Sequence, residues 1–280
     1  MTGKVVARVS KNNKLPARKK VDLTDIDPKD TGRFQNKDEV AKEVKELELE
    51  LQELQEKLAA GKKHAVLFVF QGMDCSGKDG VIKKVFAGLH PQGISAHSFK
   101  APTEEEARHD FLWRAHCAVP ALGQIAVFNR SYYEEVLITR VHGKVKDEEA
   151  KQRFKHINHF EAMLAESGVK VVKVFLHISK QFQLEKLVSR IEDPSKNWKF
   201  DPADLQERKS WKQYREYYEE LFEKCSKEAP WHVVPSDHRW YRNYAVLQIA
   251  VEALRSLDLN EPPANPELQL LLADMKKEEG

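Results

Sequence analysis

Residues 65–80 read AVLFVFQGMDCSGKDG: a run of apolar residues passes directly into the pattern G-x-x-x-x-G-K. The run predicts a buried strand, because strands covered on both faces are nearly continuous in β-branched and aromatic residues. Gly72 and Gly77 let the backbone turn tightly so that its N–H groups face an anion, and Lys78 adds a point charge. The helix expected at about 77–88 directs its positive end to the same place. The stretch therefore predicts a phosphate-binding loop between a strand and a helix.

Two carboxylates lie within or beside this loop, at Asp74 and Asp79. Asp79 stands where this motif normally has a Ser or Thr that ligates Mg²⁺. Carboxylates in a phosphate cradle repel the ligand unless Mg²⁺ lies between them. We therefore expect Asp74 to be a metal ligand or to face the acceptor phosphate. For Asp79, a role at the metal and a favourable charge at the helix N-terminus are equally good interpretations.

Further apolar runs alternate with amphipathic stretches of ten or more residues along the chain. Strands alternating with helices predict an α/β fold, a P-loop kinase-like parallel sheet flanked by helices on both faces. Helices are expected at about 201–228 and 241–257. The strands are expected at 65–70, 94–99, 125–128, 169–178 and 231–234.

The simplest domain organisation is one domain over residues 1–280, because no internal repeat or low-complexity tract interrupts the pattern. Its parts are expected as an N-terminal arm (1–35), a helix (36–60), a core (64–258) with a helical lid at about 180–215, and a tail (259–280).

The helix expected at 36–60 begins at Asn36, where Glu39 forms a loose capping box, and ends at Gly61. Its valines and leucines alternate spacings of four and three, so they share one face. That face either docks on the core of the same chain or forms a dimer seam. Fewer than three full heptads favour docking on the core.

The composition excludes several classes of protein. Lys plus Arg total 46 and Asp plus Glu total 44, a net charge of +2 that gives no signal for nucleic acid or membrane. Three cysteines exclude a disulfide scaffold and a Cys-rich zinc module, and they fit a reducing cytoplasm. Cys75 lies beside the expected helix N-terminus, which would lower the pKa of its thiol. The longest apolar run, 65–70, is far shorter than the ~20 residues of a membrane span.

The strand expected at 125–128 ends in Asn129 and Arg130. In phosphate-loop enzymes, a strand that ends beside the loop usually presents an Asp toward Mg²⁺. Asn129 keeps an oxygen donor for a metal but loses the charge. Arg130 follows at the carboxyl edge of the sheet, where ligands bind in open α/β folds; a surface arginine is the alternative.

With these motifs the chain resembles the polyphosphate kinase 2 family. The resemblance implies reversible phosphoryl transfer between inorganic polyphosphate and AMP, ADP or ATP, with Mg²⁺ or in its place Mn²⁺, in a thymidylate kinase-like fold. It also implies a homo-oligomer, a dimer or a tetramer. The matching stretches are GMDCSGKDG (72–80), FKAPTEEE and HDFLWR (within 99–114), FNRSYYEEVL and RVHG (within 128–143), and RIEDPSKNWKF and DLQERKSWKQY (within 190–214).

Roles for individual residues follow from the resemblance. Lys78 would hold the transferring phosphate, and Asp74 would ligate Mg²⁺ and steer the attacking oxygen. Arg130, with Arg190 from the lid, would neutralise charge on the transferred group. Asp204 would lie close to nucleotide and metal. The sequence FNRS followed by YYE (128–134) resembles that of the subgroup that accepts AMP as well as ADP.

A long anionic chain needs an extended basic track, so basic residues near the motifs are further candidates. Lys83 and Lys84, on the helix that leaves the loop, are equally well read as an ordinary solvated helix face. The phosphate-binding set is Gly72, Gly77, Lys78, Asp79, Gly80, Lys83, Lys84, Arg114 and Arg130, the nucleotide-binding set is Asn129, Arg190, Lys199, Asp204 and Arg208, and the metal ligands are Asp74 and Asn129.

The segment 191–204, between two expected helices, predicts a mobile lid that excludes water from the reaction, or else a structural loop. Two other functions stay open. One is an ATP-dependent nucleoside monophosphate kinase, which the basic lid and Asp79 disfavour. The other is a non-catalytic, nucleotide-sensing phosphate-loop module, which the acidic, leucine-lined helix at 36–60 would suit.

Overall fold

A computed structural model describes residues 20–259 together with 267–268, 271–272 and 275–276. The first part of the expected arm and most of the expected tail lie outside the described residues. The described core is a five-stranded parallel sheet in the order β2-β3-β1-β4-β5. Its strands are β1 (Ala65–Gln71), β2 (Ile94–Ser98), β3 (Ile125–Asn129), β4 (Val169–His177) and β5 (Trp231–Pro235).

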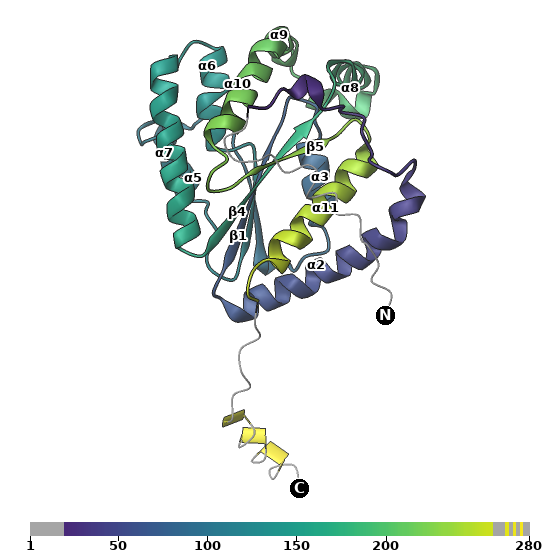
Figure 1. The fold of residues 1–280 in the computed structure, drawn as a ribbon, viewed down its shortest axis with the longest axis vertical. Coiled ribbons are helices and arrows are strands. Elements are labelled where there is room, and N and C mark those ends of the chain that lie inside the picture. The colour runs from purple at the N-terminus through teal and green to yellow at the C-terminus, as the bar shows by residue number, and fades with distance from the viewer. Residues whose placement is uncertain (1–19, 260–266, 269–270, 273–274, 277–280) are drawn as a thin grey trace.

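Every strand lies within about a residue of its expected position, and helices cover both faces of the sheet (Figure 1). All seven residues of β1 are buried. Val66, Phe68 and Phe70 belong to one hydrophobic cluster, and the alternate residues Ala65 and Leu67 belong to the other. The predicted α/β fold is therefore confirmed, with β1 and its phosphate-binding loop at the centre of the sheet. The helices of the core are α3 (Lys78–Val85), α4 (Glu104–Ala107), α5 (Trp113–His116), α6 (Ile138–Val141), α7 (Asp147–Glu166), α8 (Lys180–Glu192), α9 (Ala203–Lys209), α10 (Trp211–Lys224) and α11 (Arg239–Arg255).

The leucine-lined helix, α2 (Ala41–Gly61), packs along α11 on one face of the sheet (Figure 1). Leu51 and Leu58 are almost fully buried in the cluster that α11 also joins. The helix ends at Gly61 as expected, but the left-handed residue that follows is Lys62, with φ 49°. The apolar face of α2 thus docks on the core of its own chain.

The described part of the arm, residues 20–35, packs on the body. Leu23 and Phe34 are buried. The side chain of His177 lies 2.9 Å from the carbonyl oxygen of Ile26, and the N–H of Asp237 donates to the carbonyl of Pro28. The arm therefore crosses the carboxyl ends of β4 and β5.

One expected helix is wrong in detail. The stretch 201–228 forms two helices, α9 and α10, that are separated at Ser210, and α9 follows a short 3-10 helix, η5 (Pro194–Lys199). The N–H of Ser210 bonds back to Glu207, three residues earlier, which closes α9 with a tight turn. The break lets α9 fold over α8 while α10 packs against the sheet.

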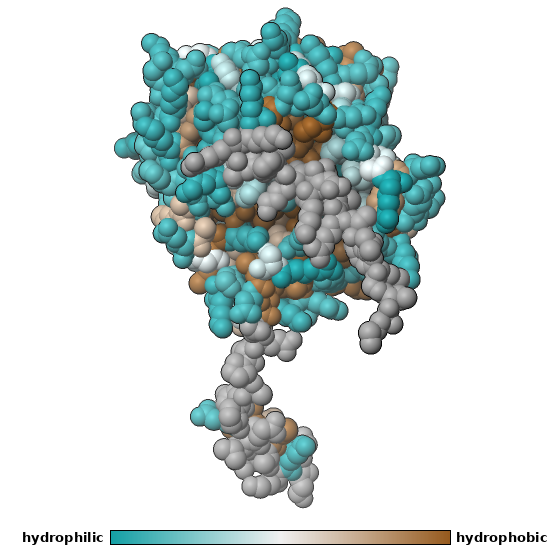
Figure 2. Space-filling model, viewed as in Figure 1, coloured by the Kyte–Doolittle hydropathy of each residue, from teal (hydrophilic) through white to brown (hydrophobic). Residues whose placement is uncertain are grey.

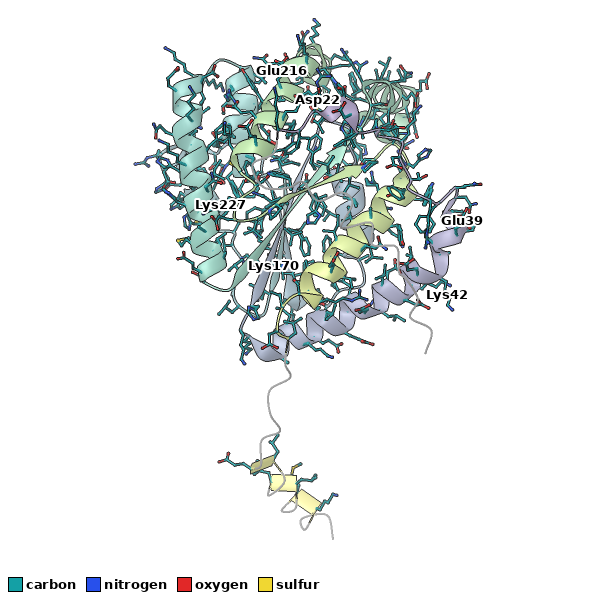
Figure 3. The ribbon with its side chains drawn as sticks, viewed as in Figure 1. Asp22, Glu39, Lys42, Lys170, Glu216 and Lys227 are labelled. Carbon is teal, nitrogen blue, oxygen red and sulfur yellow. The ribbon has the colours of Figure 1, made fainter. Side chains whose placement is uncertain are left out.

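Hydrophilic side chains cover most of the face seen in Figure 2. Charged side chains of both signs lie on this surface, for example Glu39 and Lys42 near the start of α2 and Lys227 beyond α10 (Figure 3). No helix among the described residues is long and apolar enough to span a membrane.

Candidate active site

A cavity of about 570 Å³ opens at the carboxyl ends of the strands, around the loop between β1 and α3. We call it the phosphate-loop cavity. Four parts of the chain line it: the loop, the ends of β2 and β3, the segment from α8 to α9, and the start of α11. Its described lining includes nine basic residues (Lys78, Lys100, Arg130, Lys186, Arg190, Lys196, Lys199, Arg239 and Arg242) and four acidic ones (Asp74, Asp79, Asp201 and Asp204).

Two glycines give the loop its shape. Gly72 has φ 150° and Gly77 has φ 91°, in the region that side chains rarely adopt. A Cβ on Gly72 would lie 2.8 Å from the carbonyl oxygen of Leu176, and one on Gly77 would lie 2.0 Å from Nη1 of Arg242. The loop therefore has room for glycine alone at both positions, as the motif predicts.

Lys78, the first residue of α3, is buried at the bottom of this cavity. Its Nζ donates to the carbonyl oxygens of Gly72 (2.8 Å) and Met73 (3.2 Å). Burial lowers the pKa of Lys78 to about 8, and the charge of Arg130 contributes to the shift. The ammonium is thus held by neutral carbonyls in a place where an anion would stabilise its charge.

Arg130 joins the loop to the end of β3. Its guanidinium forms an ion pair with Asp74 and lies 3.4 Å from Glu134, while its backbone takes a left-handed φ of 60°. The charge of Glu134 raises the pKa of Arg130 above its ordinary value, and Asp74 adds to the effect. Glu134 is nearly buried, and the sequence analysis missed it. Glu134 lies within the family-like stretch FNRSYYEEVL, four residues after Arg130, which was the signal that could have identified it.

Asn129 lies beside Arg130 and contacts the other loop carboxylate. Its Nδ2 donates to Asp79, in the first turn of α3. The amide nitrogen, rather than the oxygen that a metal would need, faces this carboxylate. Asp79 is exposed in the cavity mouth, where it also favours the helix N-terminus electrostatically.

The segment from α8 to α9 covers the opposite side of the cavity. Arg190 donates to Asp204 (3.0 Å) and to the carbonyl of Lys199 (3.1 Å). Burial raises the pKa of Asp204, and the nearby charge of Asp74 raises it further. Asp74 on the loop and Asp204 on α9 both line the cavity, each paired with an arginine.

One buried amide ties this segment to the loop. Gln183 on α8 donates through Nε2 to the carbonyl oxygen of Asp74 (3.1 Å) and accepts through Oε1 from Arg208 (2.9 Å). Arg208 also donates to the carbonyl of Lys180 (2.7 Å). Arg208 does not line the cavity, and its contacts join α9 to α8.

Three other candidate phosphate ligands lie away from the phosphate-loop cavity. Lys83 and Lys84 are exposed near the end of α3, and Nζ of Lys84 lies 3.2 Å from Glu48 on α2. Arg114 lies in a neighbouring cavity of about 680 Å³ beneath α4, α5 and α7. The structure does not bring these three side chains to the loop.

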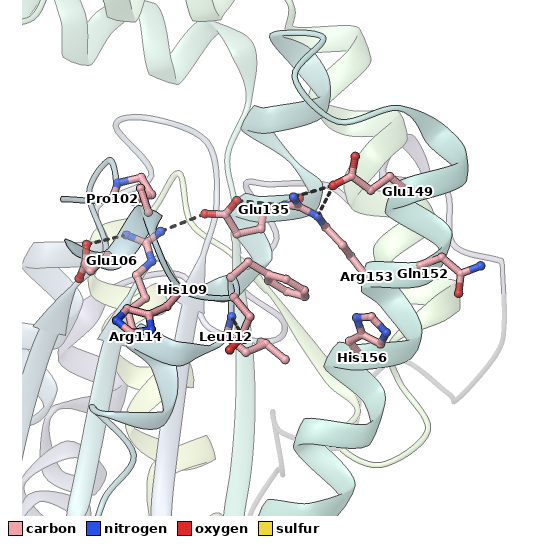
Figure 4. Close-up of a pocket in the computed structure, with 13 residues that line it drawn as sticks. Pro102, Glu106, His109, Leu112, Arg114, Glu135, Glu149, Gln152, Arg153 and His156 are labelled. Atoms are coloured by element: carbon pink, nitrogen blue, oxygen red, sulfur yellow. Dashed lines mark hydrogen bonds and ion pairs between the residues drawn. The ribbon is translucent and has the colours of Figure 1, made fainter. Parts of the chain in front are cut away.

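Arg114 and Arg153 of the neighbouring cavity are both paired with carboxylates (Figure 4). Arg114 lies 3.6 Å from Glu106 and 3.2 Å from Glu135. Arg153 lies 3.0 Å from Glu135 and 2.7 Å from Glu149. We call this the arginine–glutamate cavity; its described lining has more carboxylates than arginines.

The thiol of Cys75 behaves differently from the expectation. Burial raises its pKa to about 11, and the carboxylates of Asp204 and Asp74 add to that effect. The expected lowering of its pKa is therefore wrong in direction, because burial penalises the charged thiolate.

Comparisons with known proteins agree with this geometry. Residues 34–262 match the family model described as polyphosphate kinase 2. The chain is 44% identical over 243 residues, 86% of its length and 91% of the relative's, to the AMP/ADP-polyphosphate phosphotransferase of Meiothermus ruber. It is 42% identical to the ADP-polyphosphate phosphotransferase of Rhodopseudomonas palustris, over 81% of this chain and 83% of that protein.

A solved structure is similar over almost the whole chain. The crystal structure of polyphosphate kinase 2 from Arthrobacter aurescens superposes with a TM-score of 0.89 and 39% sequence identity. The match covers 95% of this chain and 96% of that one.

Proposed function

Because the chain belongs to the polyphosphate kinase 2 family, we propose that it transfers phosphoryl groups reversibly between inorganic polyphosphate and adenine nucleotides, phosphorylating ADP to ATP and AMP to ADP. One observation carries the proposal. The phosphate-binding loop lies in a cavity whose described lining has nine basic and four acidic side chains. This excess of positive charge favours the binding of two polyanionic substrates at the loop.

Phosphoryl transfer needs little covalent chemistry from a protein. Catalysis is positioning together with neutralisation of the charge that spreads over the transferred group. Lys78 exchanges its loop carbonyls for phosphate oxygens, and Arg130 and Arg190 reach the transferred group from β3 and from α8. Asp74 steers the attacking oxygen of the acceptor. The loop backbone holds this oxygen in line with the phosphoryl group that is transferred.

A divalent cation fits the cavity. Asp74 and Asp204 both line it, and besides burial the charge of Asp74 raises the pKa of the Asp204 carboxyl, a repulsion that a cation near both would relieve. The described residues hold no group of three or more metal-ligating side chains. Mg²⁺ does not need one, because it usually takes one or two carboxylates together with substrate phosphates and waters.

We assign Mg²⁺, or Mn²⁺ in its place, to Asp74, with Asn129 as the predicted second ligand through its amide oxygen. When bound, the ion neutralises phosphate charge and fixes the phosphates in line. Because Nδ2 of Asn129 donates to Asp79, the amide oxygen of Asn129 is the atom left for a metal. Asp204 on α9 would lie close to the metal and the nucleotide.

The segment from α8 to α9 acts as the lid, within a single domain that runs through the chain. Its basic residues Arg190, Lys196 and Lys199 line the cavity, and η5 between the two helices is mostly exposed. Closure over bound nucleotide excludes water and so prevents hydrolysis of the phosphoryl group.

The chain is proposed to be cytoplasmic and to form a homo-oligomer, a dimer or a tetramer. Its three cysteines are free thiols, which suits a reducing compartment. Leu184, Val188 and Ile191 expose one apolar face of α8, the kind of patch that protein interfaces cover. Light scattering of the purified chain distinguishes the oligomeric states.

The decisive experiment incubates purified protein and Mg²⁺ with long-chain polyphosphate and, separately, with AMP, ADP or no nucleotide. Ion-exchange chromatography then separates the products. ATP from ADP, and ADP or ATP from AMP, is the expected result. ATP from ADP alone contradicts the AMP-accepting subgroup. A parallel incubation of AMP with ATP in place of polyphosphate tests the alternative: phosphorylation of AMP by ATP but not by polyphosphate identifies a nucleoside monophosphate kinase. Bound nucleotide without any turnover identifies a sensing module.

A further inference from the structure

Four polar side chains form a network that is buried in the core of the protein. They are Tyr132 and Tyr133 of the short 3-10 helix η4 (Tyr132–Val136), Glu161 on α7 and Lys173 on β4. None of the four residues is more than 1% exposed, and none lines the phosphate-loop cavity. We call these four side chains the Lys173 network.

Lys173 stands at the centre of the network. Its Nζ donates to Oε2 of Glu161 (2.6 Å), to the hydroxyl of Tyr133 (2.8 Å) and to the carbonyl oxygen of Cys225 (2.6 Å). The other carboxylate oxygen of Glu161 accepts from the hydroxyls of Tyr132 (2.9 Å) and Tyr133 (2.6 Å). An ammonium has three donors, so each of them has an acceptor here. The network therefore joins η4 to β4, to α7 and to the residue that follows α10.

Stability alone does not explain a buried ion pair of this kind. Apolar side chains of similar volume often stabilise a core as well or better, because they need no desolvation of charge. Hydrogen bonds are directional, however, and a fully satisfied buried network restricts the segments that it joins to one arrangement. Burial raises the pKa of Tyr132 and of Tyr133 well above the ordinary value, and the charge of Glu161 adds to both shifts. Both hydroxyls therefore remain donors, and η4 is held in one orientation relative to α7 and β4.

The segment that the network holds is the one that carries Arg130. The backbone of Arg130 has a left-handed φ of 60°, and its N–H donates to the carbonyl of Phe70 at the end of β1 (3.0 Å). A residue with a side chain keeps such a backbone only where the surrounding structure imposes it. The next residue, Ser131, is the N-cap of η4 and accepts from the N–H of Tyr133 (3.2 Å). Glu134, also in η4, lies 3.4 Å from the guanidinium of Arg130. The position of η4 thus governs both the backbone and the side chain of Arg130.

Resting on the proposed function, we infer that the Lys173 network positions Arg130 for phosphoryl transfer by fixing η4. Its four members are positioning residues, because they act through Glu134 and Arg130 and do not reach the cavity themselves. A displacement of a catalytic group by about 1 Å can lower the rate of a reaction by as much as ~10²-fold. Arg130 neutralises charge that develops on the transferred group, so its displacement should lower kcat much more than it weakens the binding of either substrate.

The test compares Tyr133→Phe with Tyr244→Phe in the full chain. Tyr133→Phe removes one hydroxyl and leaves the ion pair of Glu161 and Lys173 in place. We expect kcat with polyphosphate and ADP to fall about tenfold, and the KM for each substrate to stay within about twofold. Tyr244 is the matched control, because its buried hydroxyl donates to Glu43 (2.8 Å) within the other hydrophobic cluster. Its loss should leave kcat within about twofold, and thermal unfolding compares the stability of the two variants. An equal loss of kcat in both variants overturns the inference.

A double-mutant cycle with Arg130→Lys separates positioning from a general structural effect. If the Tyr133 hydroxyl acts through the guanidinium, Tyr133→Phe should lower kcat less than about twofold once lysine replaces Arg130. The same fold loss in both backgrounds would show that the hydroxyl acts independently of Arg130, and it would overturn the inference while leaving the proposed function intact.

Hydrogen–deuterium exchange of residues 128–136 is a measurement that does not depend on turnover. We expect this segment to exchange faster in Tyr133→Phe but not in Tyr244→Phe, and equal exchange rejects the network as the group that holds it. If Tyr133→Phe does not fold, Tyr132→Phe takes its place in every comparison, because it leaves all three partners of Lys173 intact. An unmodified protein that transfers no phosphoryl group contradicts the proposed function alone, since the exchange still shows whether the network fixes the segment of Arg130.

Discussion

The arginine–glutamate cavity and the phosphate-loop cavity are similar in size and both contain arginines, but their charges are arranged in opposite ways. In the first, Arg114 and Arg153 share Glu135 and each has a further glutamate, so their charges are neutralised within the fold. In the second, basic side chains outnumber acidic ones, and Arg242 has only neutral partners. The number of arginines therefore does not identify an anion site; the charge left after internal pairing does.

The largest expected effect comes from Lys78→Ala. Because Lys78 is the cation held at the centre of the loop, its loss should lower kcat with polyphosphate and ADP by about 10³-fold or more. A coupled assay for ATP measures this, and circular dichroism checks that the variant is folded. Retention of most of the activity would show that the phosphate-loop cavity is not where the chemistry occurs.

A matched pair of conservative substitutions separates the two cavities directly. Arg130→Lys should lower kcat by about 10²-fold, because lysine keeps the charge but loses the planar fork that reaches Asp74 and the transferred group. Arg114→Lys should leave kcat within about threefold but lower the free energy of unfolding by about 1–3 kcal/mol, since its buried ion pairs are structural. Urea unfolding and steady-state kinetics on both variants measure the two effects. The reverse pattern would assign the arginine–glutamate cavity to catalysis.

The pH dependence is the next effect in size. The pKa of Lys78 is lowered to about 8, so its ammonium is charged below that pH and lost above it. We expect kcat/KM for polyphosphate to fall as the pH rises through about 8. Bound phosphate favours the charged ammonium and so raises the pKa of Lys78 in the substrate complex. The decline of kcat should therefore begin at a higher pH. Coinciding profiles for the two constants would contradict this assignment.

The same group has the opposite effect on stability. Between pH 8 and its ordinary pKa of 10.5, the unfolded chain binds the proton that folded Lys78 has released. Its contribution to the free energy of unfolding therefore rises over the range in which activity declines. Comparing thermal unfolding of the unmodified protein and of Lys78→Ala across this range isolates that contribution.

The smallest effect is expected for Lys84→Gln. The exposed Lys84 pairs with Glu48 on α2 and lies outside both cavities, so activity should stay within about twofold and stability within ~0.5 kcal/mol. Steady-state kinetics at two polyphosphate lengths test this. A selective loss with the longer chain would restore Lys84 to the basic track that the sequence suggested.

Local patterns in the sequence were enough to predict the fold. Short stretches rich in apolar residues predicted each strand to within about a residue, and the glycine pattern predicted the loop, because both depend on neighbours along the chain. The break at Ser210 was missed, because no proline or glycine marks a stop between α9 and α10.

The site was predicted only where a motif marked it. Asp74, Lys78, Arg130, Arg190 and Asp204 line one cavity as expected. Arg239 and Arg242 were missed because their position depends on the order of the strands, which brings the start of α11 to the loop only after the sheet forms. Arg114 was predicted to bind phosphate but lies in the other cavity. Its pairing with Glu106 and Glu135 depends on tertiary structure, which the spacing of residues in the sequence does not reveal.

Gln183 has a consequence for how the lid and the loop influence each other. Its one buried amide bonds at the same time to the loop backbone at Asp74 and to Arg208 on α9. Any rearrangement of the loop that breaks this bond changes the free energy of separating the segment from α8 to α9 from the loop, and that separation changes the affinity of the loop by the same factor. In thermodynamic terms the loop and this segment are coupled through one amide, and the coupling acts equally in both directions.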